Sequence, residues 1–218
     1  MEEIKGKAQV IDITGGKKHH AGLVRAKKVL LSGGIVAFPT ESFYGLAVHA
    51  MKEEAIRRLF ITKKRTNDRP ILILIHDPVV LELLVEKIPR VAQKLMQHFW
   101  PGGLTLVFKA GPRVSPLLTA HSGKIGIRLS SNPIARALSL SIDAPITGTS
   151  ANITGKPACV SAVEVGKSFG RGVDLILDGG STAGGKGSTL VDITTEPPLI
   201  LREGMIGEKD LRQFLHQE

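Results

Sequence analysis

The sequence predicts an α/β fold in one principal domain, because short apolar segments alternate along the chain with amphipathic ones. Its 218 residues can bury a sizeable core, and hydrophobic residues make up 42% of the chain. Near-continuous apolar strands indicate a twisted sheet, parallel or mixed, that is flanked by helices on both faces. We assign residues 1–20 to an N-terminal extension, residues 21–206 to the domain and residues 207–218 to a C-terminal helix.

Helical periodicity is clear in Ala21–Ser32, where Leu23, Ala26 and Leu30 share one face. Two glycines follow this segment and can end the helix in a left-handed conformation. Further amphipathic helices are expected at Lys52–Thr62, Val79–Glu86, Arg90–Phe99, Pro133–Leu140 and Ala162–Phe169.

Short apolar runs between turn residues predict the strands. The first run, Ile35–Phe38, ends at Pro39, and the sharp turn Pro101–Gly103 precedes another. The remaining strands are expected at Ile71–Ile75, Leu104–Phe108, Lys124–Leu129, Pro145–Gly148, Leu175–Leu177, Thr189–Ile193 and Leu199–Arg202. Periodicity does not set the order of these strands in the sheet.

The charge composition favours an anionic partner. Lysine and arginine number 29 against 20 aspartate and glutamate residues, which leaves a formal charge of +9. Aromatic residues make up 4% of the chain, too few to supply the stacking platforms of a protein that binds single-stranded nucleic acid. Nucleotides, phosphates, RNA and acidic lipid all fit the excess of positive charge.

The cysteine content and the hydropathy pattern predict a cytoplasmic location. Cys159 is the only cysteine, so neither an intrachain disulfide nor a cysteine zinc cluster can form, and a reducing compartment is expected. The first twenty residues contain no apolar stretch of the kind found in signal peptides. The longest apolar run, Ile71–Ile75, is far too short to cross a bilayer, so no membrane span is expected.

Polar side chains follow the predicted strand Ile35–Phe38. The segment Pro39–Leu46 places Thr40, Glu41 and Ser42 in the loop where that strand ends. Ligands of open α/β sheets collect at such strand ends, so a ligand-binding loop is one interpretation. A turn capped by its own hydroxyl groups is the other, since the same residues favour turns for local reasons.

Four cations, Lys63, Lys64, Arg65 and Arg69, lie within seven positions at the end of the predicted helix Lys52–Thr62. A phosphate clamp of this kind would hold a polyphosphate and stabilise the charge on a leaving pyrophosphate. A solvated helix end that complements the helix dipole is the competing interpretation. The buried strand predicted directly after the cluster favours the clamp.

Two later loops also carry polar groups. Thr149–Asn152 follows a predicted strand and offers hydroxyl and amide groups to a ligand, although a capping turn uses the same residues. Gly180–Lys186 has the spacing of a phosphate-binding P-loop, but Gly187 stands where Ser or Thr is required. A P-loop opens a helix, whereas Thr189–Ile193 is predicted as a strand. We therefore reject a Walker-type NTPase and predict a flexible loop that leads to Ser188.

No residue is assigned to a metal ion. His19 and His20 are adjacent, so their side chains point different ways on either regular element, and His98 and His121 lack partners at metal-ligand spacing. Cys159 has no His or Asp partner identifiable in the sequence that would activate it as a nucleophile.

The order and spacing of these segments resemble the YrdC-like family, which makes threonylcarbamoyl-adenylate for the threonylcarbamoyladenosine modification of tRNA. The resemblance covers roughly residues 21–206. It rests on Gly33–Leu46, Lys63 and Arg65 with Arg69–Pro70, Trp100–Leu106, Gly126–Leu129, Ser150–Asn152, Ser188–Asp192 and Leu201–Gly204. Two positions depart from the family pattern: Ser42 stands for a usual threonine, and Lys64 for a usual glycine.

This resemblance implies that L-threonine, bicarbonate and ATP react in a deep basic cleft to give threonylcarbamoyl-adenylate and pyrophosphate. It implies ATP as a substrate, with Mg²⁺ bridging the phosphates. It also implies that a downstream threonylcarbamoyl transferase uses the product, and a contact with tRNA or double-stranded RNA is expected. The chain resembles the short form of the family, without the further C-terminal domain that some relatives carry.

The resemblance also implies residue roles. ATP would be bound by Lys63, Arg65, Arg69, Asn152 and Arg202. L-Threonine would be bound by Thr40, Ser42, Arg128, Ser150 and Ser188. Lys63 and Arg65 would be the catalytic residues, and Arg128 would pair with the threonine carboxylate.

Two other functions are compatible with the sequence. An RNA-binding module could hold backbone phosphates in the same basic cleft without chemistry, and its binding would weaken steeply with salt. A carbamoyl-transfer domain of the same fold would cleave ATP with carbamoyl phosphate and serve another acceptor.

Overall fold

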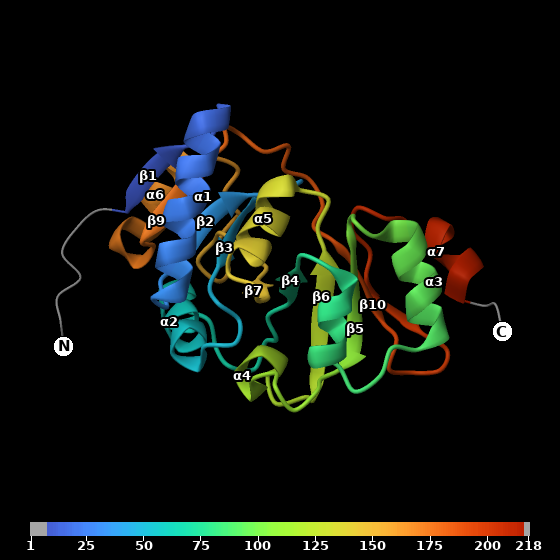
Figure 1. The fold of residues 1–218 in the computed structure, drawn as a ribbon. Coiled ribbons are helices and arrows are strands. Elements are labelled where there is room, and N and C mark those ends of the chain that lie inside the picture. The colour runs from blue at the N-terminus through green and yellow to red at the C-terminus, as the bar shows by residue number, and fades with distance from the viewer. Residues whose placement is uncertain (1–7, 216–218) are drawn as a thin grey trace.

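A computed structural model describes residues 8–215 and shows the mixed α/β fold that the sequence predicts (Figure 1). The strands divide between two twisted sheets rather than forming one. One five-stranded sheet lies on the left of Figure 1 and one six-stranded sheet on the right, with helices packed around both. Within residues 8–215, no helix combines the length and the apolar character that a membrane span requires.

The five-stranded sheet mixes parallel and antiparallel pairs. Its order is β1 (Gln9–Asp12), β9 (Leu175–Asp178), β2 (Val36–Pro39), β3 (Tyr44–Ala47) and β8 (Thr149–Ser150). The strand β9 runs parallel to both of its neighbours, whereas β2–β3 and β3–β8 are antiparallel. The β2–β3 hairpin therefore projects its connecting residues, 40–43, from one end of the sheet.

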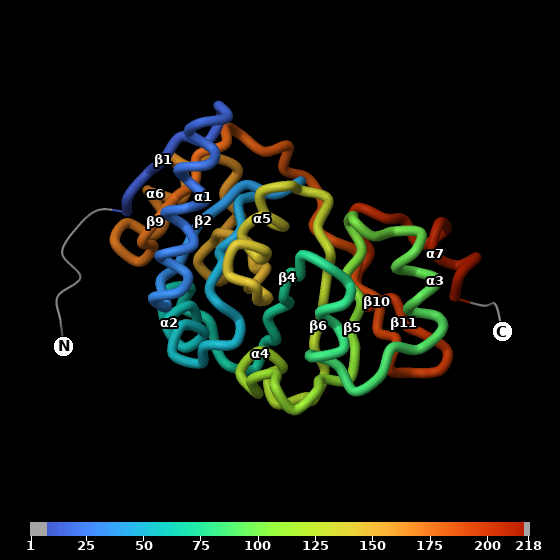
Figure 2. Tube along the Cα trace, in the orientation of Figure 1, coloured from blue at the N-terminus to red at the C-terminus, as the bar shows by residue number. Residues whose placement is uncertain are grey.

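The six-stranded sheet is also mixed. Its order is β11 (Leu199–Arg202), β10 (Thr189–Asp192), β5 (Leu104–Lys109), β6 (Lys124–Leu129), β4 (Ile73–Ile75) and β7 (Ile146–Thr147). The pairs β10–β5 and β4–β6 are parallel, and the other three are antiparallel. Figure 2 shows β11 beside β10 at the outer edge of this sheet.

The two sheets meet where β3 continues past β7. His49 forms an antiparallel bridge with Ile146, and the Thr147 N–H donates to the Val48 carbonyl at 3.1 Å. The Val48 N–H in turn donates to the buried Thr147 hydroxyl at 3.0 Å. Because the chain then continues from β7 into β8, the loop after Ser150 is fixed beside the β2–β3 hairpin.

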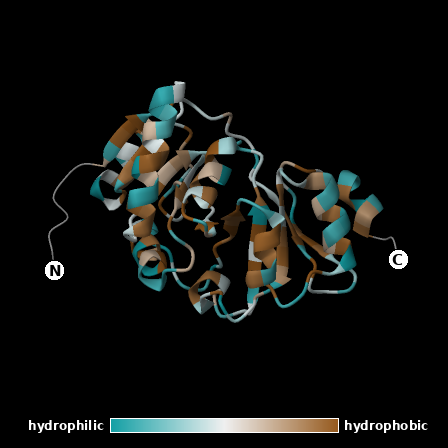
Figure 3. Cartoon of the chain, viewed as in Figure 1, coloured by the Kyte–Doolittle hydropathy of each residue, from teal (hydrophilic) through white to brown (hydrophobic). Residues whose placement is uncertain are grey.

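Side-chain alternation on β2 assigns the helices to the two faces of the five-stranded sheet. Val36 and Phe38 point into one core cluster, whereas Ala37 points into the other. The first cluster also contains residues of α1 (Gly16–Leu31) and α5 (Pro133–Ser141), and the second contains residues of α2 (Glu53–Lys63) and α6 (Ala162–Phe169). Figure 3 shows apolar strands between these helices, whose outer surfaces are hydrophilic.

The outer end of the six-stranded sheet is covered by α3 (Arg90–Phe99) and α7 (Glu208–Leu215), which lie side by side in Figure 1. Edge contacts between the rings of Phe99 and Phe214 join the two helices. The helix α7 lies within the segment assigned to a C-terminal helix, and residues 216–218 lie outside the described residues, as do residues 1–7 of the assigned N-terminal extension.

Several elements differ from those that periodicity predicts. The helix α1 begins at Gly16 instead of Ala21, and Val79–Glu86 is a 3₁₀ helix over Pro78–Leu83, whose start is capped by the Asp77 carboxylate. Five short elements lie outside the predicted ones: β1, β3, β8, α4 (Pro116–Thr119) and the 3₁₀ helix Gly170–Gly172. These elements depend on pairing and capping more than on a long periodic pattern.

Candidate active site

A cavity of about 350 Å³ lies between the two sheets and gathers residues from distant parts of the sequence. It is lined by Phe38, Thr40, Ser42, Phe43, Tyr44, Gly45, Arg65, Pro70, Ile71, Leu72, Leu74, Arg128, Gly148, Thr149, Ser150, Ala158, Gly187, Ser188 and Arg202. Seven of these residues were assigned to the site from the sequence: Thr40, Ser42, Arg65, Arg128, Ser150, Ser188 and Arg202. The other three assigned residues, Lys63, Arg69 and Asn152, do not line it.

The β2–β3 loop places its hydroxyl groups at the cavity through its own hydrogen bonds. Both the N–H and the Oγ1 of Thr40 donate to the Phe43 carbonyl, at 3.0 and 2.6 Å. Ser42 is buried, and its carbonyl accepts from the Gly184 N–H at 2.6 Å. Gly45 packs closely behind this loop, since a Cβ there would lie 3.0 Å from the Phe38 ring.

Arg128 reaches the cavity because of strand alternation. Its neighbours Ile127 and Leu129 on β6 point into the core, so the intervening side chain emerges on the opposite face of the sheet. Its Nε donates to the Gly102 carbonyl at 2.7 Å. Gly102 can be only glycine, because a Cβ there would lie 2.4 Å from the Phe99 carbonyl oxygen.

Arg128 also has an acidic partner, which is a finding that the sequence did not predict. Glu41 places Oε2 at 2.6 Å from Nη2 of Arg128, and both side chains are largely buried. Burial alone would raise the pKa of the Glu41 carboxyl, but the Arg128 charge and the Ser130 hydroxyl outweigh it and lower the pKa to about 2. The guanidinium assigned to a substrate carboxylate is therefore already paired with a carboxylate of the chain.

Lys63 is the last residue of α2, and it lies on the buried face of that helix together with Ile56, Leu59 and Phe60. Its Nζ donates to the carbonyl oxygens of Ser150 and Asn152, at 2.5 and 2.7 Å. Burial, and then the charge of Arg65, lower the pKa of the ammonium group to about 7. The oxygen acceptors around Nζ favour the protonated form. Lys63 thus holds the end of β8 and the residues after it, and it is not among the residues that line the cavity.

Asn152 has a similar local role. Its Oδ1 accepts from the Ser150 hydroxyl at 2.6 Å, and its Nδ2 donates to the Lys156 carbonyl at 2.8 Å. The amide therefore shapes its own loop instead of lining the cavity, which is where ATP contact was expected.

Arg65 lines the cavity and is oriented by the backbone of its own segment. Its Nη2 donates to the Pro70 carbonyl at 2.8 Å, and its Nε to the Arg69 carbonyl at 3.2 Å. The side chain of Arg69 is exposed and lies outside the cavity. Lys64 adopts a left-handed conformation, with φ of 50°, which glycine would adopt at a lower cost.

Another part of the lining consists of Gly187 and Ser188, which precede β10, and of Arg202, which ends β11. The Thr105 hydroxyl donates to the Ser188 Oγ at 2.8 Å, and Arg202 Nη2 donates to the Ser188 carbonyl at 2.8 Å. The turn after Arg202 is fixed by the buried Thr189 hydroxyl, which accepts from the N–H groups of Gly204 and Ile206 at 2.9 Å each.

The glycine-rich segment 179–187 leads toward β10, as the sequence predicts, and its last residue, Gly187, lines the cavity. The Tyr44 hydroxyl donates to the Gly180 carbonyl at 2.7 Å, and the Thr182 N–H donates to the Val160 carbonyl at 2.8 Å. Burial, together with nearby Asp178, raises the pKa of Tyr44 to about 12, so the hydroxyl stays protonated and can donate. The segment is therefore anchored at several points, although it contains three glycines with positive φ, Gly180, Gly184 and Gly185.

Metal ligands are scarce around the cavity. Within residues 8–215, no group of three or more His, Cys, Asp or Glu side chains could hold a metal ion. No Asp or Glu is among the lining residues. Cys159 is buried, with its Sγ at 3.5 Å from the Ser168 hydroxyl.

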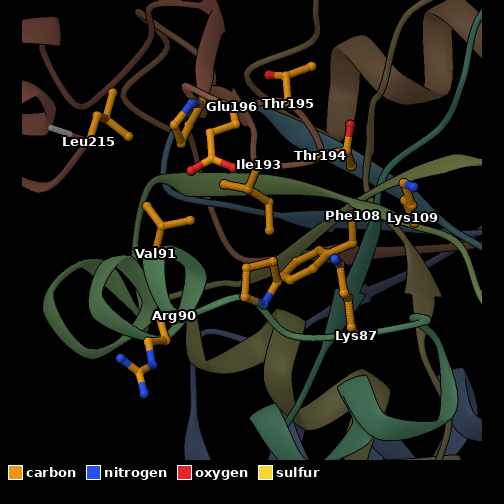
Figure 4. Close-up of a pocket in the computed structure, with 12 residues that line it drawn as sticks. Lys87, Arg90, Val91, Phe108, Lys109, Ile193, Thr194, Thr195, Glu196 and Leu215 are labelled. Carbon is orange, nitrogen blue, oxygen red and sulfur yellow. The ribbon is translucent and has the colours of Figure 1, made fainter. Parts of the chain in front are cut away.

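A second cavity, of about 380 Å³, lies at the far end of the six-stranded sheet (Figure 4). Lys87, Arg90 and Lys109 are its cationic lining residues, and all three are exposed. In Figure 4 the Arg90 guanidinium points away from the other labelled side chains. None of the residues assigned to the site from the sequence lines this cavity, so the smaller cavity between the sheets is the candidate active site.

The Glu41–Arg128 pair predicts a pH-dependent contribution to stability. Because the pKa of Glu41 is lowered from 4.5 to about 2 on folding, the contribution is present above pH 4.5 and is lost as the pH falls through about 2. Glu41→Gln should lower the free energy of unfolding by about 3 kcal/mol at pH 7, and the deficit should shrink below about pH 5. Urea unfolding at several pH values measures this. Glu53→Gln, which removes an exposed carboxylate paired with Arg57, is the control, and an equal, pH-independent effect of both changes would contradict the assignment.

Comparisons with known proteins identify the family of the chain. The Sua5/YciO/YrdC family model, described as telomere recombination, matches residues 28–204. The threonylcarbamoyl-AMP synthase of Pyrococcus abyssi is 37% identical over 195 residues, which are 89% of this chain and 56% of that protein. The threonylcarbamoyl-AMP synthase of Bacillus subtilis is 34% identical over 214 residues, 97% of this chain and 62% of that protein.

A solved structure shows the same fold. P. abyssi Sua5 complexed with L-threonine superposes with a TM-score of 0.89 at 35% identity, covering 95% of this chain and 61% of that one. The chain thus spans about 56–62% of the length of these relatives. With most of its residues matched by the family model, the chain belongs to the Sua5/YciO/YrdC family.

Proposed function

We propose that this chain forms threonylcarbamoyl-adenylate and pyrophosphate from L-threonine, bicarbonate and ATP, for the threonylcarbamoyladenosine modification of tRNA. The observation that carries the proposal is one cavity that is lined by three arginines, Arg65, Arg128 and Arg202, and by hydroxyl residues from three separate segments. Its volume of about 350 Å³ falls in the range of small-molecule sites. The names of the two relatives and the L-threonine complex support the same activity.

The cavity offers two kinds of binding surface. Arg65 and Arg202 take no part in an ion pair within residues 8–215, so their full charges are available to a triphosphate. Arg128 lines the cavity together with the hydroxyl residues Ser42 and Ser188, and this set suits an amino acid that carries a carboxylate, an amine and a hydroxyl. We therefore assign ATP to the first surface and L-threonine to the second, with Thr40 and Ser150 as further threonine contacts.

The reaction needs no covalent nucleophile from the protein. A carbamate oxygen of N-carboxy-threonine would attack the α-phosphorus of ATP, and the bond from that phosphorus to the bridging oxygen would break to release pyrophosphate. Fixed cations would stabilise the negative charge that develops on the leaving group. Holding both substrates in one cavity would supply much of the remaining rate.

The contacts of Lys63 suggest that it positions the segment carrying Ser150 and does not bind ATP directly. Direct contact with ATP would require Nζ to leave the Ser150 and Asn152 carbonyls. In its described position Lys63 instead stabilises the loop that carries Ser150, with Asn152 as its partner. Arg65 is then the catalytic cation, and Arg69 is the weakest of the assigned ATP ligands, because it lies outside the cavity.

Mg²⁺ has no carboxylate cage in this cavity, since no acidic residue lines it. Residues 8–215 therefore do not fit a protein-held Mg²⁺ site there, and the ion would be bound through the triphosphate. The contact with tRNA or double-stranded RNA, the downstream transferase and the cytoplasmic location remain predictions from the sequence and the family.

Substrate omission tests the proposed reaction directly. Pyrophosphate release from ATP should require L-threonine and bicarbonate together, and mass spectrometry should detect threonylcarbamoyl-adenylate only in the complete mixture. An RNA-binding module would release no pyrophosphate. A carbamoyl-transfer domain would require carbamoyl phosphate in place of bicarbonate and threonine, so either pattern would refute the proposal.

Replacing Lys63 should strongly reduce turnover. Lys63→Ala removes the cation that organises the segment Ser150–Asn152, and we expect roughly a hundredfold lower kcat, the loss typical of a substrate-binding group that is misplaced by about 1 Å. Steady-state pyrophosphate release measures it. Arg57→Ala, on the exposed side of the same helix, should change kcat by less than about twofold. Turnover of Lys63→Ala close to that of the parent would remove Lys63 from the mechanism.

A further inference from the structure

Glu41 links two elements that meet at the cavity. It lies on the β2–β3 loop, and its Oε1 accepts from the hydroxyls of Ser130 and Ser131, at 2.5 and 2.8 Å, and from the Asn132 N–H at 2.9 Å. Its Oε2 lies 2.6 Å from Nη2 of Arg128. One oxygen therefore fixes the carboxylate to the segment before α5, and the other faces the arginine.

The contact with Arg128 is a charge contact without hydrogen-bond alignment. Oε2 of Glu41 and Nη2 of Arg128 are both buried, and neither has a hydrogen-bond partner within residues 8–215. The guanidinium is held from its other side by the Gly102 carbonyl on Nε. Arg128 is thus fixed in place while part of its donor capacity stays unused, which is the condition for accepting a further acceptor group.

Glu41 also makes the electrostatic environment of Arg128 different from that of the other two arginines in the cavity. Of the three arginines that line it, Arg128 alone forms an ion pair within residues 8–215. A carboxylate so close to Arg128 partly cancels its field and repels a multiply charged triphosphate more strongly than a singly charged carboxylate. Arg65 and Arg202 keep their uncompensated charges and attract the polyphosphate.

We propose that Glu41 is a positioning residue that holds Arg128 and reserves it for the carboxylate of the amino-acid substrate. This inference rests on the proposed function and extends it, because it states how one cavity keeps its two anionic substrates apart. Glu41→Gln removes the negative charge of the side chain but keeps its size and shape. The amide oxygen can still accept from Ser130, Ser131 and Asn132, but the amide nitrogen then presents a donor to the Arg128 guanidinium.

Calorimetric titration of L-threonine into the intact chain tests the inference. We expect Glu41→Gln to bind L-threonine at least about tenfold more weakly than the parent, the loss expected for a mispositioned charged donor. A non-hydrolysable ATP analogue should bind the variant at least as tightly as it binds the parent, and only in the variant should the analogue weaken threonine binding further. Retained binding of the analogue also reports that the variant is folded.

Two further variants serve as comparisons for Glu41→Gln. Glu41→Asp keeps the charge but is too short to reach both partners, so it should bind L-threonine with an intermediate affinity and should not let the analogue compete. Glu53→Gln should match the parent throughout. If Glu41→Gln and Glu41→Asp bind L-threonine as the parent does, this inference is wrong while the proposed function stands. If the parent binds no L-threonine, the proposed function fails and the inference fails with it.

Discussion

The structure depends on holding several like charges close together in a partly enclosed space. Each cation around the cavity donates to main-chain carbonyls: Lys63 to residues 150 and 152, Arg65 to residues 69 and 70, Arg128 to residue 102, and Arg202 to residue 188. Carbonyl acceptors fix the direction of a side chain without cancelling its full charge. The cations are therefore preorganised and still attractive to an anion, and Arg128 differs from the others by its contact with Glu41.

The position of these carbonyls follows from the way the two sheets are joined. The bridge between His49 and Ile146 ties the continuation of β3 to β7, and the next residues form β8 against β3. Two loops remote in sequence, one carrying Ser42 and one carrying Ser150, are thereby fixed against each other. Glycines matter where backbone segments approach closely, as at Gly204, where a Cβ would lie 2.2 Å from the Gly187 carbonyl oxygen. The backbone contacts that join the two sheets therefore also fix the loops that line the cavity.

Many of the helices and strands are predictable from the sequence. The elements and contacts that are not predictable depend on interactions between segments that are remote in the sequence. The bounds of α3, α6, β6 and β11 agree with the predicted ones. The patterns of α3, α6 and β6 are periodic, and β11 is a short apolar run between Pro198 and Glu203. The inward orientation of Lys63 could have been predicted as well, since it continues the buried spacing of Ile56, Leu59 and Phe60. The strands β3 and β8 could not, because pairing between sheet neighbours decides them. The contact of Glu41 with Arg128 joins the two sheets, and no local pattern encodes it.

The central claim is that one cavity between the sheets binds both substrates in fixed places. A crystal structure of the intact chain with L-threonine and a non-hydrolysable ATP analogue tests it most directly. The account predicts phosphate oxygens within hydrogen-bond distance of Arg65 and Arg202, and the threonine carboxylate on Arg128. Density for either ligand outside this cavity, for example beside Phe108 at the far end of the six-stranded sheet, or a triphosphate on Arg128, would contradict it.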